Sequence, residues 1–296
     1  MFNIPEQLAR LYKAYDELPN YKVVAGEGPQ DTVYVFFSSK GLFNENSFED
    51  FTSKILMQDR YEWENVICSP ELRKAAGTFI LVRDIRMNDW LTGISGTDNT
   101  PEKVMQRLQK LCAGKQHCIF CGSSMGGFAA LVFGTMLAAE RIFVFSPIVD
   151  LDSFNRFCIS EGAPVRDTNH HAALINDPNM AAYIAPLPQI AEYSGALYWF
   201  YPNQFAYDVS QYDLVKENPH IRFFSVNRHQ HGSTIPVESI IRVISESQNR
   251  LDVLHEKYKG KRINPLLFLR DTHGFFGAFA ILLRRFVKKL RKKQHF

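Results

Sequence analysis

The feature that most constrains the fold of this chain is a glycine-flanked serine between a predicted strand and a predicted helix. The apolar run 116–120 is typical of a strand, and 128–134 fits a buried helix. Between them, Gly122, Ser124 and Gly126 form a Gly-x-Ser-x-Gly pattern. A sharp turn leaves no room for side chains at the flanking positions, and glycine accepts strained backbone angles. The sequence therefore predicts that the turn lifts the Ser124 hydroxyl off the sheet edge.

Further strands and helices alternate along the chain. Near-continuous apolar runs, the pattern of strands buried on both faces, occur at 33–37, 78–82, 118–120, 141–145, 196–200 and 221–226, with a shorter run at 22–24. Helical spacing occurs between them, for example at 100–111 and 237–258. This alternation predicts an α/β protein with a mostly parallel, doubly wound sheet.

Composition and charge limit the class of protein. The 296 residues include five cysteines, an odd set without framework or metal-site spacing, and the first residues lack a secretory pattern. Residues 260–296 hold ten Lys or Arg and one Asp, whereas 1–259 are acidic by about six charges. An acidic body argues against a nucleic-acid surface. We therefore expect a cytoplasmic protein with no bound metal or cofactor and no specific nucleic-acid partner.

A serine nucleophile needs a base, and His231 is the first candidate. It lies in the loop after the last predicted strand, 221–226, and is followed by Gly232. That loop belongs to the carboxyl edge of the sheet, where Ser124 is expected. His229 is the second candidate, and both histidines could instead be ordinary surface residues.

The base needs an orienting acid, and Asp208 is the first candidate because it follows the strand 196–200 by a short loop. Asp213 is a nearby competitor, and Asp150 or Asp152 could serve from the end of the strand 141–145. A single loop aspartate is otherwise most often a turn or cap residue.

The remaining site candidates surround the serine. The Met125 N–H, at the start of the helix, is expected to face a developing oxyanion. Ser38 or Ser39, after the strand 33–37, would give the second donor. Arg83 ends the strand 78–82, where it could bind an anionic substrate group, or pair with Asp84 to hold a loop.

Two segments lie outside this pattern. Residues 151–195, after the sixth strand of the expected fold, contain no clear strand and predict a helical insertion, either a cap over the pocket or a peripheral packing element. The tail 260–296, which we separate from a domain of residues 1–259, has an apolar stretch at 274–283, too short to span a bilayer. Basic residues follow it, which predicts an amphipathic helix at an anionic membrane surface. An acidic protein or RNA is the alternative partner.

With Ser124, Asp208 and His231 in this order, the chain resembles the α/β-hydrolase superfamily over about residues 30–250. It also resembles bacterial proteins of capsule and other surface-polysaccharide synthesis. That second resemblance depends on Arg83-Asp84 with Trp90 and Gly93, on the sequence from Gly122 to Leu131, and on Phe145-Ser146-Pro147. A His-Gly pair, familiar in the loop after the first buried strand, is absent from 38–41.

These resemblances imply a serine esterase or an O-acyltransferase that moves an acetyl group, with acetyl-CoA as donor, to a sugar hydroxyl. The substrate would be a small molecule or a glycan, and the protein would work at the inner membrane face. The alternatives are a non-catalytic scaffold that tethers a polysaccharide machine to the membrane, and a peripheral lipase with an apolar groove under 151–195.

Overall fold

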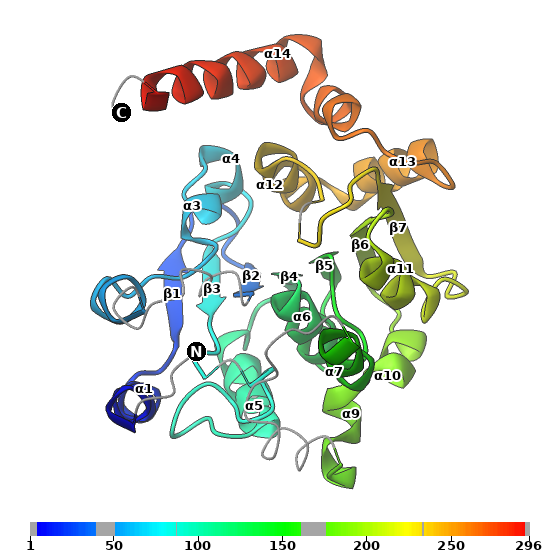
Figure 1. Ribbon diagram of the computed structural model, residues 1–296. Coiled ribbons are helices and arrows are strands. Elements are labelled where there is room, and N and C mark those ends of the chain that lie inside the picture. Colours follow the sequence, from blue (N-terminus) through cyan, green and yellow to red (C-terminus); the bar gives the residue numbers. More distant parts are fainter. Residues whose placement is uncertain (1–4, 40–50, 87, 161–175, 233, 294–296) are drawn as a thin grey trace.

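A seven-stranded sheet forms the centre of the molecule (Figure 1). The computed structural model describes residues 5–39, 51–86, 88–160, 176–232 and 234–293. The strands are β1 (Tyr21–Ala25), β2 (Thr32–Phe37), β3 (Thr78–Val82), β4 (His117–Ser123), β5 (Arg141–Phe145), β6 (Ala196–Pro202) and β7 (Ile221–Val226). Their order is β1-β3-β2-β4-β5-β6-β7. All neighbours are parallel except β1, which pairs with β3 in the antiparallel sense.

The apolar runs become strands because helices cover both faces of the sheet. Every residue of β2 and of β6 is buried. The predicted strands are confirmed, each within two residues at its ends, except that β4 continues three residues past the predicted end at 120.

Two helical layers enclose the sheet (Figure 1). One face packs against α5 (Pro101–Leu111), α6 (Met125–Met136), α7 (Leu151–Ser160), α9 (Ala181–Ile184), α10 (Leu187–Glu192) and α11 (Ala206–Asp213). The other packs against α3 (Glu64–Ile67), α4 (Pro70–Arg73), α12 (Val237–Ser245), α13 (Gln248–Tyr258) and the start of α14 (Pro265–Lys293). A smaller cluster joins α1 (Pro5–Glu17) to the π-helix η2 (Phe51–Met57).

The strand order, the antiparallel edge strand and the β4–α6 turn define an α/β-hydrolase fold, as predicted. The insertion between β5 and β6 contains α7, η3 (Pro178–Met180), α9 and α10. The insertion follows the fifth of the seven strands. We predicted from the sequence that it follows the sixth strand, a number that was one too high. The middle of the predicted cap, 161–175, lies outside the described residues.

The core extends past the predicted domain boundary at residue 259. Ile263 forms a bridge with Val226 of β7, and Phe268 is buried against Phe200 and Phe224. The first half of α14 therefore belongs to the packed body, because its apolar residues complete one face of the sheet.

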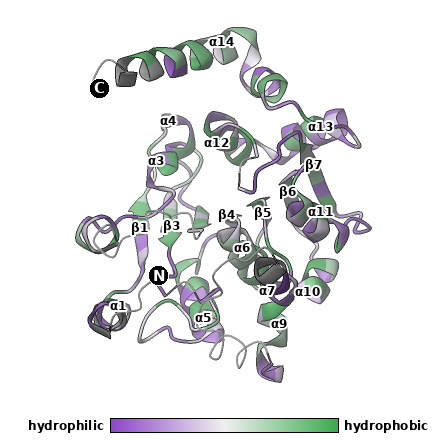
Figure 2. Cartoon of the chain, viewed as in Figure 1, coloured by the Kyte–Doolittle hydropathy of each residue, from purple (hydrophilic) through white to green (hydrophobic). Residues whose placement is uncertain are grey.

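The second half of α14 lies at the outside of the molecule, beyond α12 and α4, with hydrophobic and hydrophilic residues along it (Figures 1 and 2). Gly274 interrupts the helix with φ 73° and ψ 170°. By length and apolar composition alone, Pro265–Val287 could cross a membrane. Of the 18-residue apolar stretch within it, 28% is buried inside the protein. This helix is longer than the ten-residue stretch seen in the sequence, because both sides of the glycine are helical.

Candidate active site

Ser124 stands on a strained turn between β4 and α6. Its backbone has φ 52° and ψ −119°, a left-handed conformation that costs a non-glycine residue about 1–3 kcal/mol. Its N–H donates to the Phe145 carbonyl at 2.9 Å, which ties the turn to β5. A Cβ on Gly122 would lie 2.0 Å from the Gly126 carbonyl oxygen, and one on Gly126 would lie 2.2 Å from the Phe37 oxygen. The flanking glycines are therefore required by close backbone contacts, as the sequence pattern predicts.

A chain of two hydrogen bonds connects Ser124, His231 and Asp208. Ser124 Oγ lies 2.7 Å from His231 Nε2. The other ring nitrogen, Nδ1, lies 2.9 Å from Asp208 Oδ2. The residues come from the β4–α6 turn, the loop after β7 and the first turn of α11, so the three chosen from the sequence meet at one edge of the sheet.

Burial differs between the two ends of this hydrogen-bonded set of side chains. The Asp208 side chain is 1% exposed and that of His231 is 28% exposed. The rings of Phe205 and Tyr207 lie 6.0 and 5.8 Å from the imidazole ring, centre to centre. The buried carboxylate and the aromatic rings therefore hold the imidazole from one side.

The competing candidates have other contacts. His229 is exposed in the same loop. Asp213 pairs with Lys216 at 3.0 Å. Asp150 accepts backbone hydrogen bonds at the start of α7, and Asp152 pairs with Arg156 on that helix.

The predicted oxyanion donors differ in availability. Met125 is the first residue of α6, where N–H groups lack a carbonyl one turn earlier. The Ser38 N–H, in contrast, donates to the Val82 carbonyl at 2.9 Å as an extension of the sheet. The Ser39 N–H donates to the Glu62 carboxylate, and its hydroxyl donates to the same group at 2.8 Å. Both proposed second donors thus already have an acceptor: Val82 of β3 accepts from Ser38, and Glu62 accepts from Ser39.

Glu62 is a partly buried carboxyl group with these two Ser39 contacts. Burial raises the pKa of Glu62, although the hydrogen bonds from Ser39 oppose this shift. The group therefore holds its proton more tightly in the folded protein than in the unfolded chain.

The geometry contradicts the predicted substrate-binding role of Arg83. Its side chain is 1% exposed and lies over the Tyr61 ring, 4.3 Å from the centre. The guanidinium donates to the carbonyls of Ile55 and Arg60 at 3.2 and 2.9 Å. It also pairs with Asp59 at 3.1 Å, not with Asp84. A buried cation with all these acceptors holds the segment around η2 in place and cannot reach a substrate.

Ser146 supports the histidine loop and was not chosen from the sequence as a site residue. It is fully buried with φ 48°, and its hydroxyl accepts a hydrogen bond from the Gly232 N–H at 3.2 Å. Its own N–H donates to the Phe200 carbonyl at 2.7 Å. The only signal in the sequence is the position of Phe145-Ser146-Pro147 directly after a strand, which does not reveal a contact with residue 232.

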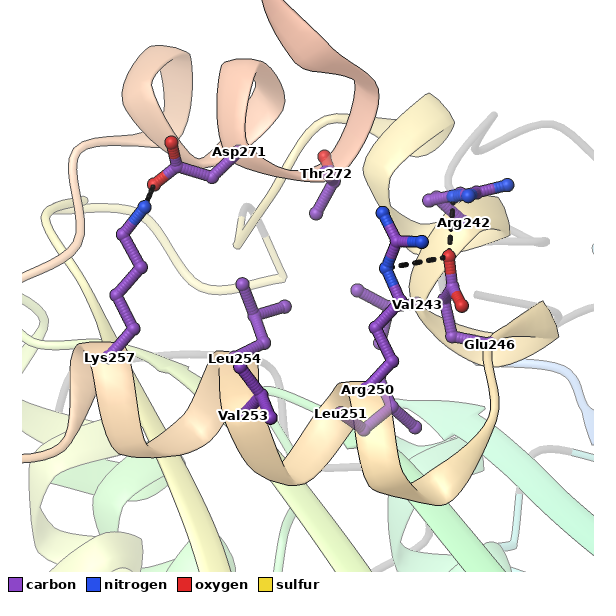
Figure 3. A pocket seen from close by; sticks show the side chains of 10 residues that line it. All are labelled: Arg242, Val243, Glu246, Arg250, Leu251, Val253, Leu254, Lys257, Asp271 and Thr272. Carbon is purple, nitrogen blue, oxygen red and sulfur yellow. Dashed lines mark ion pairs between the residues drawn. The ribbon is translucent and has the colours of Figure 1, made fainter.

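A separate pocket of about 220 Å³ lies between α12, α13 and the start of α14 (Figure 3). Its lining includes Val243, Leu251 and Leu254, with charged groups around them. These charges are paired: Lys257 with Asp271 at 2.6 Å, and Arg242 and Arg250 both with Glu246. The pocket shares no residue with the Ser124 site. Within the described ranges, no cluster of three or more His, Cys, Asp or Glu residues forms a metal site.

Several solved structures are similar to this chain. The capsule O-acetyltransferase of Neisseria meningitidis serogroup A is 13% identical, with a TM-score of 0.48 over 82% of this chain and 90% of that one. Proline iminopeptidase of Mycobacterium smegmatis is 10% identical, with a TM-score of 0.43 over 80% and 93%. A fluorophosphonate-binding serine hydrolase of Staphylococcus aureus is 10% identical, with a TM-score of 0.46 over 80% and 95%. No protein-family model matches the chain, and no curated protein matches its sequence.

Proposed function

We propose that this protein is a serine-dependent acyl-transfer enzyme. The observation that supports this most strongly is the continuous hydrogen-bond chain from Ser124 through His231 to Asp208, starting on a strained strand-to-helix turn. A serine placed only for packing needs neither a histidine nitrogen at 2.7 Å nor a left-handed backbone.

In the first half of the proposed reaction, Ser124 Oγ attacks the carbonyl carbon of an ester or thioester while its proton passes to His231 Nε2. The buried Asp208 carboxylate orients the imidazole and stabilises its protonated form. The Met125 N–H donates to the oxyanion of the tetrahedral intermediate. The carbon–oxygen or carbon–sulfur bond then breaks, and the leaving group takes the proton from His231.

In the second half, an acceptor hydroxyl gives its proton to His231 and attacks the acyl-serine, and His231 returns that proton to Ser124. Water as acceptor makes the protein an esterase. A glycan hydroxyl makes it an O-acyltransferase, and we propose acetyl-CoA as donor and a bacterial surface polysaccharide as acceptor. The support for this finer proposal is the resemblance of the Gly122–Leu131 and Phe145–Pro147 segments to surface-polysaccharide proteins.

Labelling of the purified full chain with a fluorophosphonate probe tests the nucleophile. We expect the wild type to be labelled and Ser124→Ala to be unlabelled. Ser123→Ala is the matched control, because it removes a neighbouring hydroxyl, and it should be labelled like the wild type. A folded wild type that takes up no probe would favour the non-catalytic scaffold instead.

Incubation with acetyl-CoA tests the finer proposal. Intact-mass measurement should show one acetyl group on the wild type and none on Ser124→Ala. A bacterial polysaccharide with its O-acetyl groups removed should then speed the release of free CoA. If release is unchanged by the polysaccharide but an acetyl ester is hydrolysed through Ser124, the protein is an esterase. A preference for long-chain esters would indicate the lipase.

A further inference from the structure

The second half of α14 carries a continuous apolar surface on one side. We call this surface the apolar stripe; it consists of Phe275, Phe276, Phe279, Leu282, Leu283, Phe286, Val287 and Leu290, all between 38% and 84% exposed. Their spacing of one, three and four residues places them on one face of a helix. An exposed patch of this size, with four phenylalanines, indicates a binding surface rather than ordinary surface composition.

The opposite face of the same helix is attached to the body. Ala278 and Ile281 are each 6% exposed, and the Arg285 guanidinium pairs with Glu238 of α12, with one contact at 3.1 Å. At helical spacing these three residues lie away from the centre of the stripe. The helix is therefore held in place by one side while the stripe points outward.

The length of the segment excludes a membrane-spanning arrangement of the folded protein. Only nine residues lie between the break at Gly274 and the first arginine, Arg284. They measure about 14 Å as a helix, against about 30 Å of hydrocarbon in a bilayer. Before the break, Phe268 and Thr272 are buried in the body, and Asp271 pairs with Lys257. Those residues could enter a bilayer only if that part of the fold opened.

The charge of the segment selects its partner. Seven Lys or Arg residues lie between 284 and 293, and no acidic residue occurs after Asp271. A second copy of this chain is a poor partner, since a two-fold contact would bring two such basic segments together. An anionic lipid surface complements both features at once: acyl chains receive the stripe, and phosphates attract the basic residues.

We propose that the second half of α14 binds an anionic bilayer from one side, lying in the plane of the interface with the apolar stripe in the acyl region. The proposal is independent of the chemistry at Ser124. It attaches the body rigidly to the membrane, because Arg285, Ala278 and Ile281 fix the helix against it.

Flotation of the full chain with vesicles tests this. Vesicles of phosphatidylcholine with one-third phosphatidylglycerol should carry the protein upward, and pure phosphatidylcholine vesicles should carry much less. The double variant Phe276→Ser/Phe279→Ser should lower the partition coefficient about 100-fold, because two large apolar side chains no longer enter the bilayer. Met57→Ser is the matched control: Met57 is 79% exposed but lies on η2, and this change should leave binding unaltered.

Three results would overturn the proposal. The first is no binding of the folded wild type to anionic vesicles. The second is a dimer in solution that dissociates in the Phe276→Ser/Phe279→Ser variant, which would show that a second copy covers the stripe. The third is resistance of the bound protein to alkaline extraction, which would show a helix that crosses the bilayer.

Discussion

Two helices that each contain an apolar stretch differ in what covers that stretch. α6 and the second half of α14 both combine glycine and alanine with large apolar side chains. In α6 every residue from Met125 to Gly134 is buried, since the helix packs on β2, β4 and β5. In α14, Phe276 is 84% exposed. Apolar composition thus shows that a segment avoids water, but not whether the protein itself or another phase covers it.

Residue spacing distinguishes the two helices. α6 is apolar around its whole circumference, the pattern of a helix enclosed by protein. The second half of α14 has apolar residues on one face and ends in a basic cluster. Four experiments test whether the core around α6, with the candidate active site, and the outer part of the molecule around α14 differ as this spacing indicates.

The largest contrast concerns turnover of an activated ester such as p-nitrophenyl acetate. Ser124→Ala should lower kcat about 10⁴-fold or more, because loss of the nucleophile removes the covalent route. Phe276→Ser should leave turnover in free solution within about twofold, as its ring touches no part of the Ser124 site. Residual activity of Ser124→Ala above about a tenth of wild type would remove Ser124 from the mechanism.

The free energy of unfolding should respond differently to removal of a buried and of an exposed phenylalanine ring. Phe128→Ala in α6 empties a site that is 1% exposed and should lower the free energy of unfolding by about 3–5 kcal/mol. Phe276→Ala should change it by less than about 0.5 kcal/mol. Urea titration of both variants measures the difference. Equal losses would mean that the protein's own core covers Phe276 in solution.

Removal of two fully buried hydroxyl groups should affect turnover differently near the Ser124 site and near the start of α14. Ser146→Ala removes the acceptor of the Gly232 N–H and should cost about 1 kcal/mol and lower kcat about tenfold, because the His231 loop loses a support. Ser239→Ala removes a contact with Thr272 in α14 at similar cost, with turnover unchanged. If Ser146→Ala lost stability but kept kcat, a role in positioning His231 would be excluded.

The smallest contrast is in pH dependence, where two glutamates should act in opposite directions. The raised pKa of Glu62 means that the wild type loses stability as pH rises from the ordinary glutamate value through the raised one. Glu62→Gln should remove that loss. At Glu238, burial raises the pKa, but Arg285, a backbone hydrogen bond and His273 together lower it further, so the net shift is downward. That stabilisation is present above the ordinary pKa and disappears as pH falls through the lowered one, so Glu238→Gln should be most destabilising near neutral pH.

Urea titrations of both variants between about pH 4 and pH 7 measure these slopes. Two slopes of the same sign would contradict the opposite environments of the two carboxyl groups. The effect of Glu238 should also weaken in high salt, because its ion pair with Arg285 is partly exposed to solvent.

The sequence predicted the sheet well because strand formation here depends on local runs of apolar residues. The predicted meeting of Ser124, Asp208 and His231 at one edge of the sheet also follows from the strand order, since the carboxyl ends of parallel strands lie there. The catalytic roles of these residues remain predictions. The predicted role of Arg83 was wrong for a physical reason: its partners at 55, 59 and 60 come from η2 and the turn after it, more than twenty residues earlier in the sequence. Contacts of this kind, like that between Ser146 and Gly232, leave no periodic pattern in a sequence.

The backbone of Ser124 has a consequence for the evolution of this protein. Position 124 needs a left-handed conformation that glycine adopts without strain. A change to glycine should therefore increase stability by about 1 kcal/mol while it removes the hydroxyl. Selection for stability alone would therefore favour the loss of this serine. Its presence on the strained turn is what selection for chemistry, rather than for folding, would maintain.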